Sequence, residues 1–441
     1  MNQILYDYEQ LNATTWMYIS SLIAVAVFFK FNRFWSVRNL DLVAIIALAP
    51  GLLMVTKGES LEPIGYTWLF VVTGVLLVRM LVDPLMVRRP LLEPNLSSGG
   101  VTFMGCALMV FLSANVITKQ LTESDLEGAR EVQRLLSRQP PPPDAEPLAV
   151  HGPGFPLLHL VATVPNNVLL VPDETLPEDQ RQTLVLATTT RTMAILSHLA
   201  VVLGLVLIGH LHFGNARTGM AAAALYLVLP YTAKMVGQVD HVLPAALMVW
   251  AVAAYRRPFI AGVLIGLAAA AIYYPIFLAP LWTSFYWQRG RGRFLVGLIA
   301  ALLLSVGSLV FTSSDLESFL AQLRSMLGWT SLAVEHAEGF WTFVPTAYRL
   351  TAATLYIALS AAFALWPARK DLGTLMSCSA ALMLGAQFWH SPGGGLCMAW
   401  YLPLVLMTIF RPNLEDRVAQ TVLGDGWFSH RPARRPVEQA A

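Results

Sequence analysis

Long apolar runs separated by short polar clusters make up most of this chain. Thirteen runs can be distinguished, at roughly 13–29, 40–56, 64–82, 100–117, 191–211, 218–233, 241–255, 258–271, 275–288, 293–311, 345–365, 373–390 and 395–410. Many approach the roughly 20 residues that a helix needs to cross a bilayer. Backbone groups in lipid must be satisfied within their own segment, and no period-two alternation indicates a barrel. The pattern therefore predicts an all-α, polytopic transmembrane helical bundle.

Basic residues between the runs predict the orientation of this bundle. They flank the ends of the odd-numbered runs, as Lys30, Arg33, Arg38, Arg79, Arg88, Arg89, Arg217, Arg256, Arg257, Arg289, Arg291, Arg293, Arg369, Lys370 and Arg411. If successive runs alternate in direction, all of these residues lie on one side, which the positive-inside rule makes cytoplasmic. The N-terminus is then outside and the C-terminal tail inside.

The eighth and ninth runs, at 258–271 and 275–288, are short for full crossings. Arginines precede the pair at 256–257 and follow it at 289–293, so both flanks belong on the cytoplasmic side. Pro275 interrupts a helix, because it lacks an N–H and clashes with the preceding turn. We predict a short hairpin with its apex at Tyr273 to Pro275; a single kinked helix is the alternative.

Two long polar loops, at 118–190 and 312–344, fall on the predicted outer side. In the first loop, Ser124 and Glu127 have the spacing of a capping box. Apolar residues then recur at helical spacing, which predicts an amphipathic helix along the membrane surface: Leu126, Ala129, Val132, Leu135 and Leu136. We divide the chain into an N-terminal three-helix membrane extension (1–99), a membrane core (100–410) and a basic cytoplasmic tail that we expect to be disordered (411–441).

Composition excludes several classes of protein. The 441 residues are 56% hydrophobic and 13% charged, whereas soluble domains carry about 25% charged residues. The net charge of +2 and the lack of a basic stripe with interleaved aromatics predict no nucleic-acid partner. Cys106, Cys378 and Cys397 lack the spacing of a metal site or a disulfide framework. The first run follows no positively charged region, so we predict a retained helix rather than a cleaved signal.

Two acidic clusters are the candidates for function. Asp240 lies in the sequence Gly237-Gln-Val-Asp-His241 between two apolar runs, and an acid at the edge of a membrane span is by default a functional-site hypothesis. Glu123, Asp125 and Glu127 open the first long loop. Structural roles are the alternatives: Asp125 can stabilise the first turn of a helix, and Asp240 can cap the helix of the seventh run. The predicted topology places both clusters outside.

The features of the chain after residue 100 follow a recognisable order. Asp125 follows a span, and an amphipathic helix and the Pro-containing turn His151–Pro156 come next. Further along are His212–Arg217, an Ala-rich span from Ala221 to Pro230, the acid Asp240, and a hairpin introduced by Arg256-Arg257-Pro258 with the sequence Ala261–Ala268. This order resembles the GT-C superfamily of membrane glycosyltransferases, particularly branches that transfer mannose or related sugars.

The resemblance implies a glycosyltransferase with a GT-C-like bundle. Such an enzyme transfers a sugar from a polyprenyl-phosphate donor to a lipid or glycan acceptor, on the external face of a bacterial cytoplasmic (inner) membrane. The chain also departs from the family. It has Asp125-Leu-Glu127 where the family often has Asp-Glu, and Tyr274 where many members have Lys before Pro. Its first three spans have no counterpart in the simplest members.

Sugar transfer needs a base for the acceptor hydroxyl, and positive charge or a metal for the departing phosphate. Asp125 is the first candidate for the base, because it follows a span beside the membrane surface where a lipid donor would lie; Glu127 and Glu123 are the substitutes. The resemblance gives Asp240 a role in binding a divalent cation or in orienting the acceptor; no other cofactor is assigned. The candidate substrate-binding residues are Lys234, His241, Tyr274, His336, Arg349 and His390. Interfacial anchoring is the alternative for the basic members of this set.

Two other interpretations stay open. The chain can be a transporter or flippase whose buried acids bind protons or ions, or a non-catalytic relative that keeps the bundle. An enzyme is expected to place Asp125 and Asp240 at one outward cavity. A transporter is expected to place its charges near the bilayer midplane, with a path from both sides.

Overall fold

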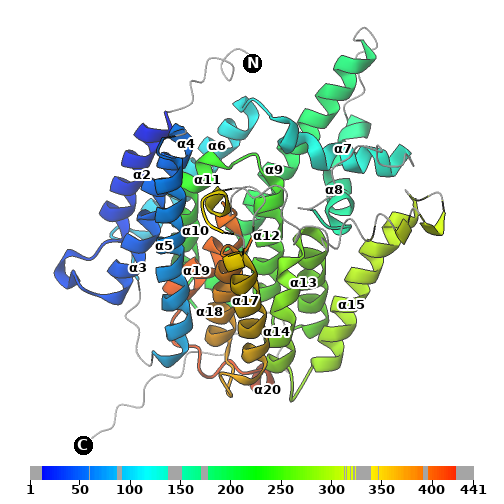
Figure 1. Cartoon of the computed structure of the whole chain (residues 1–441). Helices are drawn as coiled ribbons and strands as arrows, with labels where there is room; N and C mark the ends of the chain where they lie inside the picture. The colour runs from blue at the N-terminus through cyan, green and yellow to red at the C-terminus, as the bar shows by residue number, and fades with distance from the viewer. Residues whose placement is uncertain are drawn as a thin grey trace, which may run out of the picture.

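The computed structural model describes residues 12–58, 60–86, 92–137, 151–169, 177–311, 313, 315–317, 319–320, 323, 339–345, 347–390 and 396–423. Within this part of the chain, all regular structure is helical (Figure 1). Six helical segments are long and apolar enough to cross a membrane, and six shorter apolar helices accompany them. The predicted all-α bundle is therefore confirmed.

The N-terminal helices form the blue and cyan side of the bundle in Figure 1. They are α2 (Ala13–Phe28), α3 (Val37–Ile46), α4 (Leu48–Lys57), α5 (Glu62–Val82) and α6 (Ser98–Thr118). The single span predicted at 40–56 consists of α3 and α4 joined at Ala47. Pro50 lacks the N–H that would bond to the carbonyl of Ile46, which accounts for the interruption.

The remaining membrane helices follow the predicted order closely. They are α9 (Glu178–Leu211), α10 (Ala216–Val228), α11 (Pro230–Lys234), α12 (Val239–Ala253), α13 (Pro258–Ile272), α14 (Ala279–Phe285), α15 (Arg291–Ser308), α17 (Ala347–Leu365), α18 (Leu372–Ala386) and α19 (Leu402–Phe410). Helices α13 and α15 approach most closely. A Cβ atom at Gly262 would lie 2.1 Å from the carbonyl oxygen of Phe294, so only glycine permits this backbone contact.

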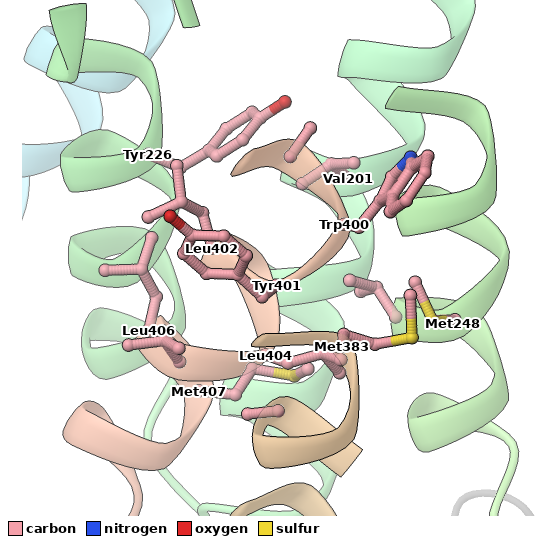
Figure 2. Packing of buried hydrophobic residues seen from close by; sticks show 14 of the residues in the cluster. Val201, Tyr226, Met248, Met383, Trp400, Tyr401, Leu402, Leu404, Leu406 and Met407 are labelled. Atoms are coloured by element: carbon pink, nitrogen blue, oxygen red, sulfur yellow. The ribbon is translucent and has the colours of Figure 1, made fainter. Parts of the chain in front are cut away.

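The core of the bundle surrounds α19, whose residues are all buried. Figure 2 shows Leu404, Leu406 and Met407 of this helix packed among side chains of its neighbours, including Tyr226 of α10 and Met383 of α18. A helix that is apolar on every face is stable only when protein or lipid covers it completely. Helix α19 is thus an internal element, with the longer helices around it.

The first long loop is more helical than predicted. It contains α7 (Glu123–Ser137), α8 (Gly154–Leu169) and the first turns of α9, which begins at Glu178 instead of near residue 191. The polarity of residues 178–190 concealed this extension from the hydrophobic pattern. They contain the helix formers Glu, Gln, Arg, Leu and Ala and no Gly or Pro, so a helix can continue through them despite their threonines.

Helix α7 is the predicted amphipathic helix, with Leu126, Ala129 and Val132 buried. Its start differs from the prediction. The capping box joins Thr122 and Asp125, whose carboxylate accepts a hydrogen bond from the backbone N–H of Thr122 at 2.9 Å. The expected pairing of Ser124 with Glu127 is wrong, because the helix begins earlier and places Ser124 within its first turn.

The chain reverses at Tyr273, as the hairpin prediction requires. Tyr273 has a φ of 58°, a left-handed value that is uncommon for a non-glycine residue, and a short 3-10 helix, η3 (Tyr274–Leu278), leads into α14. Gly290 then packs against Pro258, at the start of α13. The arginines on both flanks therefore lie at the same end of the bundle.

The predicted basic side is held together by direct contacts. Asp83 accepts hydrogen bonds from Arg79 at 2.8 Å and from Arg411 at 2.7 Å, and Arg79 also binds Asp41 at 2.7 Å. Arg38 donates to the backbone carbonyl of Arg411. These contacts join α3 and α5 to the end of α19, opposite the end that carries α7 and α8 (Figure 1). We call the latter the α7 end.

Candidate active site

Asp125 lies at the α7 end with a fully satisfied carboxylate. Lys119, which follows α6, donates to both carboxylate oxygens at 3.0 Å. Thr122 donates through its backbone N–H and, at 2.8 Å, through its hydroxyl. The Asp125 side chain has no exposed surface. These contacts fix the carboxylate at the junction of α6 and α7.

Gly237 connects this junction to the second acidic cluster. A Cβ atom at Gly237 would lie 2.8 Å from Nζ of Lys119 and 3.3 Å from a carboxylate oxygen of Asp125. The backbone before α12 therefore rests directly on the Lys119–Asp125 pair. Asp240 follows three residues later, so the structure brings both predicted acids to one end of the bundle.

Asp240 differs from Asp125 in its surroundings. It is the second residue of α12, whose N-cap is Gln238, so the alternative of Asp240 as the cap residue is wrong. Its side chain is 22% exposed. One carboxylate oxygen lies 3.7 Å from Nε2 of His151 and 3.6 Å from Nε2 of His241, distances that exceed those of hydrogen bonds. This carboxylate is accessible and is flanked by two imidazoles.

His151 links Asp240 to a further acid, Glu131 on α7. Its other ring nitrogen, Nδ1, lies 4.0 Å from a carboxylate oxygen of Glu131, and its ring stacks on Phe155 with centroids 4.1 Å apart. Burial raises the pKa of Glu131 to about 7. Burial by itself would lower the pKa of His151, but the carboxylates of Asp240 and Glu131 outweigh it and raise that pKa.

His241 faces a polar wall made by other helices. Its Nδ1 lies 2.8 Å from the hydroxyl of Tyr231 and its Nε2 lies 3.5 Å from the sulfur of Cys397. The indole N–H of Trp400 donates to the backbone carbonyl of Asp240 at 3.3 Å. The turn before α19 therefore closes one side of the site.

Two more predicted residues meet beside this wall. The hydroxyl of Tyr274, at the hairpin apex, lies 2.6 Å from Nδ1 of His390, whose ring is tilted against Trp400. Arg349, on α17, is buried and donates to the carbonyl of Trp389 at 2.8 Å. His336 lies outside the described residues.

Lys234 lies at the mouth of a separate cavity. This cavity has a volume of about 250 Å³ and is lined by α2, α4, α6 and α11, with Trp16, Leu52 and Phe111 among its apolar residues. Both Lys119 and Lys234 line it, and Lys234 is exposed. Val236 also lines it, so the cavity adjoins the segment that leads to Asp240.

Three polar residues of the site were missed by sequence reasoning. Lys119 and Glu131 were not singled out, and His151 was noted only as part of a turn. Glu131 lies at the edge of the apolar stripe of α7, four residues after the exposed Glu127, so the sequence pattern did not mark it as buried. Nothing in the local sequence indicates that Lys119 lies against Gly237, because that contact depends on the packing of distant segments.

Among the described residues, one group of acidic and histidine side chains has the geometry of a cation site. Single ligand atoms of Glu127, Glu131 and His151 all lie within 4.8 Å of one another. Asp240, the sequence-based metal candidate, lies outside this group and contacts its His151.

Comparison with known proteins gives one match. The family model of glycosyltransferase family 87 matches residues 168–392, just over half of the chain. The matched region contains Lys234, Asp240, His241, Tyr274 and Arg349, whereas α7 precedes it. Searches of curated proteins and of solved structures found no match. With its apolar helical bundle and this family match, the chain belongs to glycosyltransferase family 87, a family of GT-C-type integral membrane glycosyltransferases.

Proposed function

We propose that this glycosyltransferase takes a sugar from a polyprenyl-phosphate donor and transfers it to a lipid or glycan acceptor at the α7 end. One observation carries the proposal: Val236 lines an apolar cavity that holds two lysines, and the partly exposed carboxylate of Asp240 follows four residues later. Basic residues gather at the opposite end of the bundle, which supports the α7 end as the external face of a bacterial inner membrane.

The cavity suits the donor. Apolar residues such as Trp16 and Phe111 offer a surface for the first isoprene units, while Lys119 and Lys234 offer positive charge to the phosphate. Charged donors held in place before the reaction stabilise the negative charge that develops on a leaving phosphate. Because Lys119 also binds Asp125, its ammonium is held in position before the donor arrives.

In the proposed reaction, the acceptor hydroxyl oxygen forms a bond to the anomeric carbon of the sugar. The bond between that carbon and the phosphate oxygen breaks, and polyprenyl phosphate leaves with the electron pair. The hydroxyl proton passes to a carboxylate. The sequence favoured Asp125 as this base; the surroundings of the two acids favour Asp240, because it is accessible while Asp125 is enclosed by donors.

A defined assay tests the donor class. The purified chain in liposomes, with a total lipid and glycan extract as acceptor, is expected to transfer radiolabelled mannose from a polyprenyl-phosphate donor. Nucleotide-linked mannose is expected to give no product, because the cavity offers an apolar surface for a lipid chain. Chromatography of the extracted products measures transfer, and donors with other sugars establish specificity. Transfer from the nucleotide sugar, or none from any lipid-phosphate sugar, would contradict the proposal.

Replacing Lys234 with glutamine is expected to raise the KM for the donor by about tenfold, which corresponds to the loss of one charged hydrogen bond. The value of kcat is expected to fall as well, because the lysine also stabilises the negative charge that develops on the leaving phosphate. Lys57→Gln is the matched control, since Lys57 is exposed at the end of α4 and does not line the cavity. An equal effect of both variants would exclude a specific role for Lys234.

A further inference from the structure

Glu131 is a buried acid without a partner that explains its burial. It is 9% exposed, and neither carboxylate oxygen has a hydrogen-bond partner among the described residues. A buried carboxylate without such a partner is costly, and native proteins provide one for nearly every buried polar group. The missing partner is therefore the feature to be explained.

The position of His151 indicates what kind of partner fits. Its Nδ1 faces Glu131 at 4.0 Å, which is too long for a hydrogen bond. The imidazole is 6% exposed, and stacking on Phe155 fixes its orientation. A nitrogen and a carboxylate oxygen at this separation can both bind an ion that lies between them.

Glu127 completes the arrangement from the solvent side. It precedes Glu131 by four residues on α7, so the two side chains lie on the same face of the helix. Glu127 is exposed, and one of its oxygens lies within 4.8 Å of the ligand atoms of Glu131 and His151. The group thus has two inner ligands and one outer ligand through which an ion can enter.

We propose that Glu127, Glu131 and His151 bind one divalent first-row transition-metal ion. An imidazole nitrogen combined with two carboxylates favours such an ion over Mg²⁺ or Ca²⁺, which prefer sites made entirely of oxygen. Asp240 faces the opposite ring nitrogen of His151 at 3.7 Å. A carboxylate on the far side of a metal-bound histidine holds the ring in the correct tautomer and orientation.

None of the three ligands lines the cavity that we assign to the donor. Ion binding at this site is a property separate from the proposed transfer reaction. The site joins α7 to the segment before α8, and it holds His151 beside Asp240. Ion binding can be measured without donor or acceptor. Failure of the metal site would leave the transfer assay intact, and failure of transfer would leave ion binding intact.

The test is a titration of the purified full-length chain in detergent with Mn²⁺ alone, followed by electron paramagnetic resonance of the free ion. The wild-type chain is expected to bind one Mn²⁺, which an excess of Mg²⁺ does not displace. Glu131→Gln and Glu127→Gln are each expected to weaken binding by about 100-fold or more, and Asp240→Asn by about 10- to 100-fold.

Glu123→Gln is the matched control, because Glu123 is an exposed acid of the same helix that pairs with Arg130. It is expected to bind Mn²⁺ like the wild type. Glu127 is exposed, so its variant remains informative if Glu131→Gln fails to fold. Absence of stoichiometric binding in the wild type would overturn the proposal. So would equal binding in the wild type and a folded Glu127→Gln or Glu131→Gln chain.

Discussion

Asp240→Asn is expected to lower the rate of sugar transfer by about 10²- to 10⁴-fold, the usual contribution of a general base. Asparagine preserves the shape of the side chain but cannot accept the hydroxyl proton. Because the carboxylate is partly exposed and its two histidine neighbours are more than 3.5 Å away, the substitution is expected to leave the fold unchanged. Transfer of radiolabelled sugar and thermal unfolding, measured on the same preparation, check both statements.

Asp416→Asn serves as the control for this experiment. Asp416 is an exposed aspartate before α20 (Ala419–Val422), and its carboxylate lies 3.7 Å from Nε of Arg417. The same chemical change there is expected to leave transfer at the wild-type rate. If Asp240→Asn retains wild-type transfer, Asp240 is not the base and the proposed mechanism fails.

Asp125→Ala is expected to reduce the free energy of unfolding by about 2–3 kcal/mol, the usual cost of losing hydrogen bonds to a charged group together with a helix cap. The substitution leaves the ammonium of Lys119, which is 22% exposed, without its carboxylate, and it removes the capping box of α7. A lower midpoint of thermal or denaturant-induced unfolding in detergent is the measurement. Glu123→Ala, in the same turn but exposed, is expected to leave the midpoint unchanged.

The isosteric variant Asp125→Asn separates the two roles considered for this residue. If Asp125 supports the structure, the variant is expected to unfold at a lower temperature and, while folded, to retain measurable transfer. A variant that unfolds like the wild type but transfers no sugar would instead identify Asp125 as the base, as the sequence predicted. It would also contradict the assignment of that role to Asp240.

The hydrophobic pattern predicted the fold well, because each membrane helix must satisfy its own backbone. The hairpin was predictable from the arginines on both its flanks and from Pro275, and Gly290 does return to Pro258. Helix boundaries were less accurate where polar residues continue a helix, as at the start of α9. There the helix begins before the apolar run does.

The site was predictable only in part. Asp240, His241 and Tyr274 stood out because polar residues beside apolar runs are unusual. Glu131 and His151 did not. His151 lies beside Asp240, and Glu131 lies on the other side of the His151 ring. Their relationship arises from the packing of α7 and α8 against α9 and of α8 against α13, and no local spacing encodes such long-range packing. The assignment of roles therefore required coordinates.

The bare backbone at Gly237 has a consequence for how the two substrates of the proposed reaction affect each other's binding. In the proposed reaction, an arriving phosphate attracts the ammonium of Lys119, which rests on this backbone just upstream of Asp240. A displacement of that ammonium changes its contact with Gly237, in the main chain that leads to the Asp240 carboxylate. We therefore expect donor and acceptor to change each other's affinity by the same factor, whichever of them binds first.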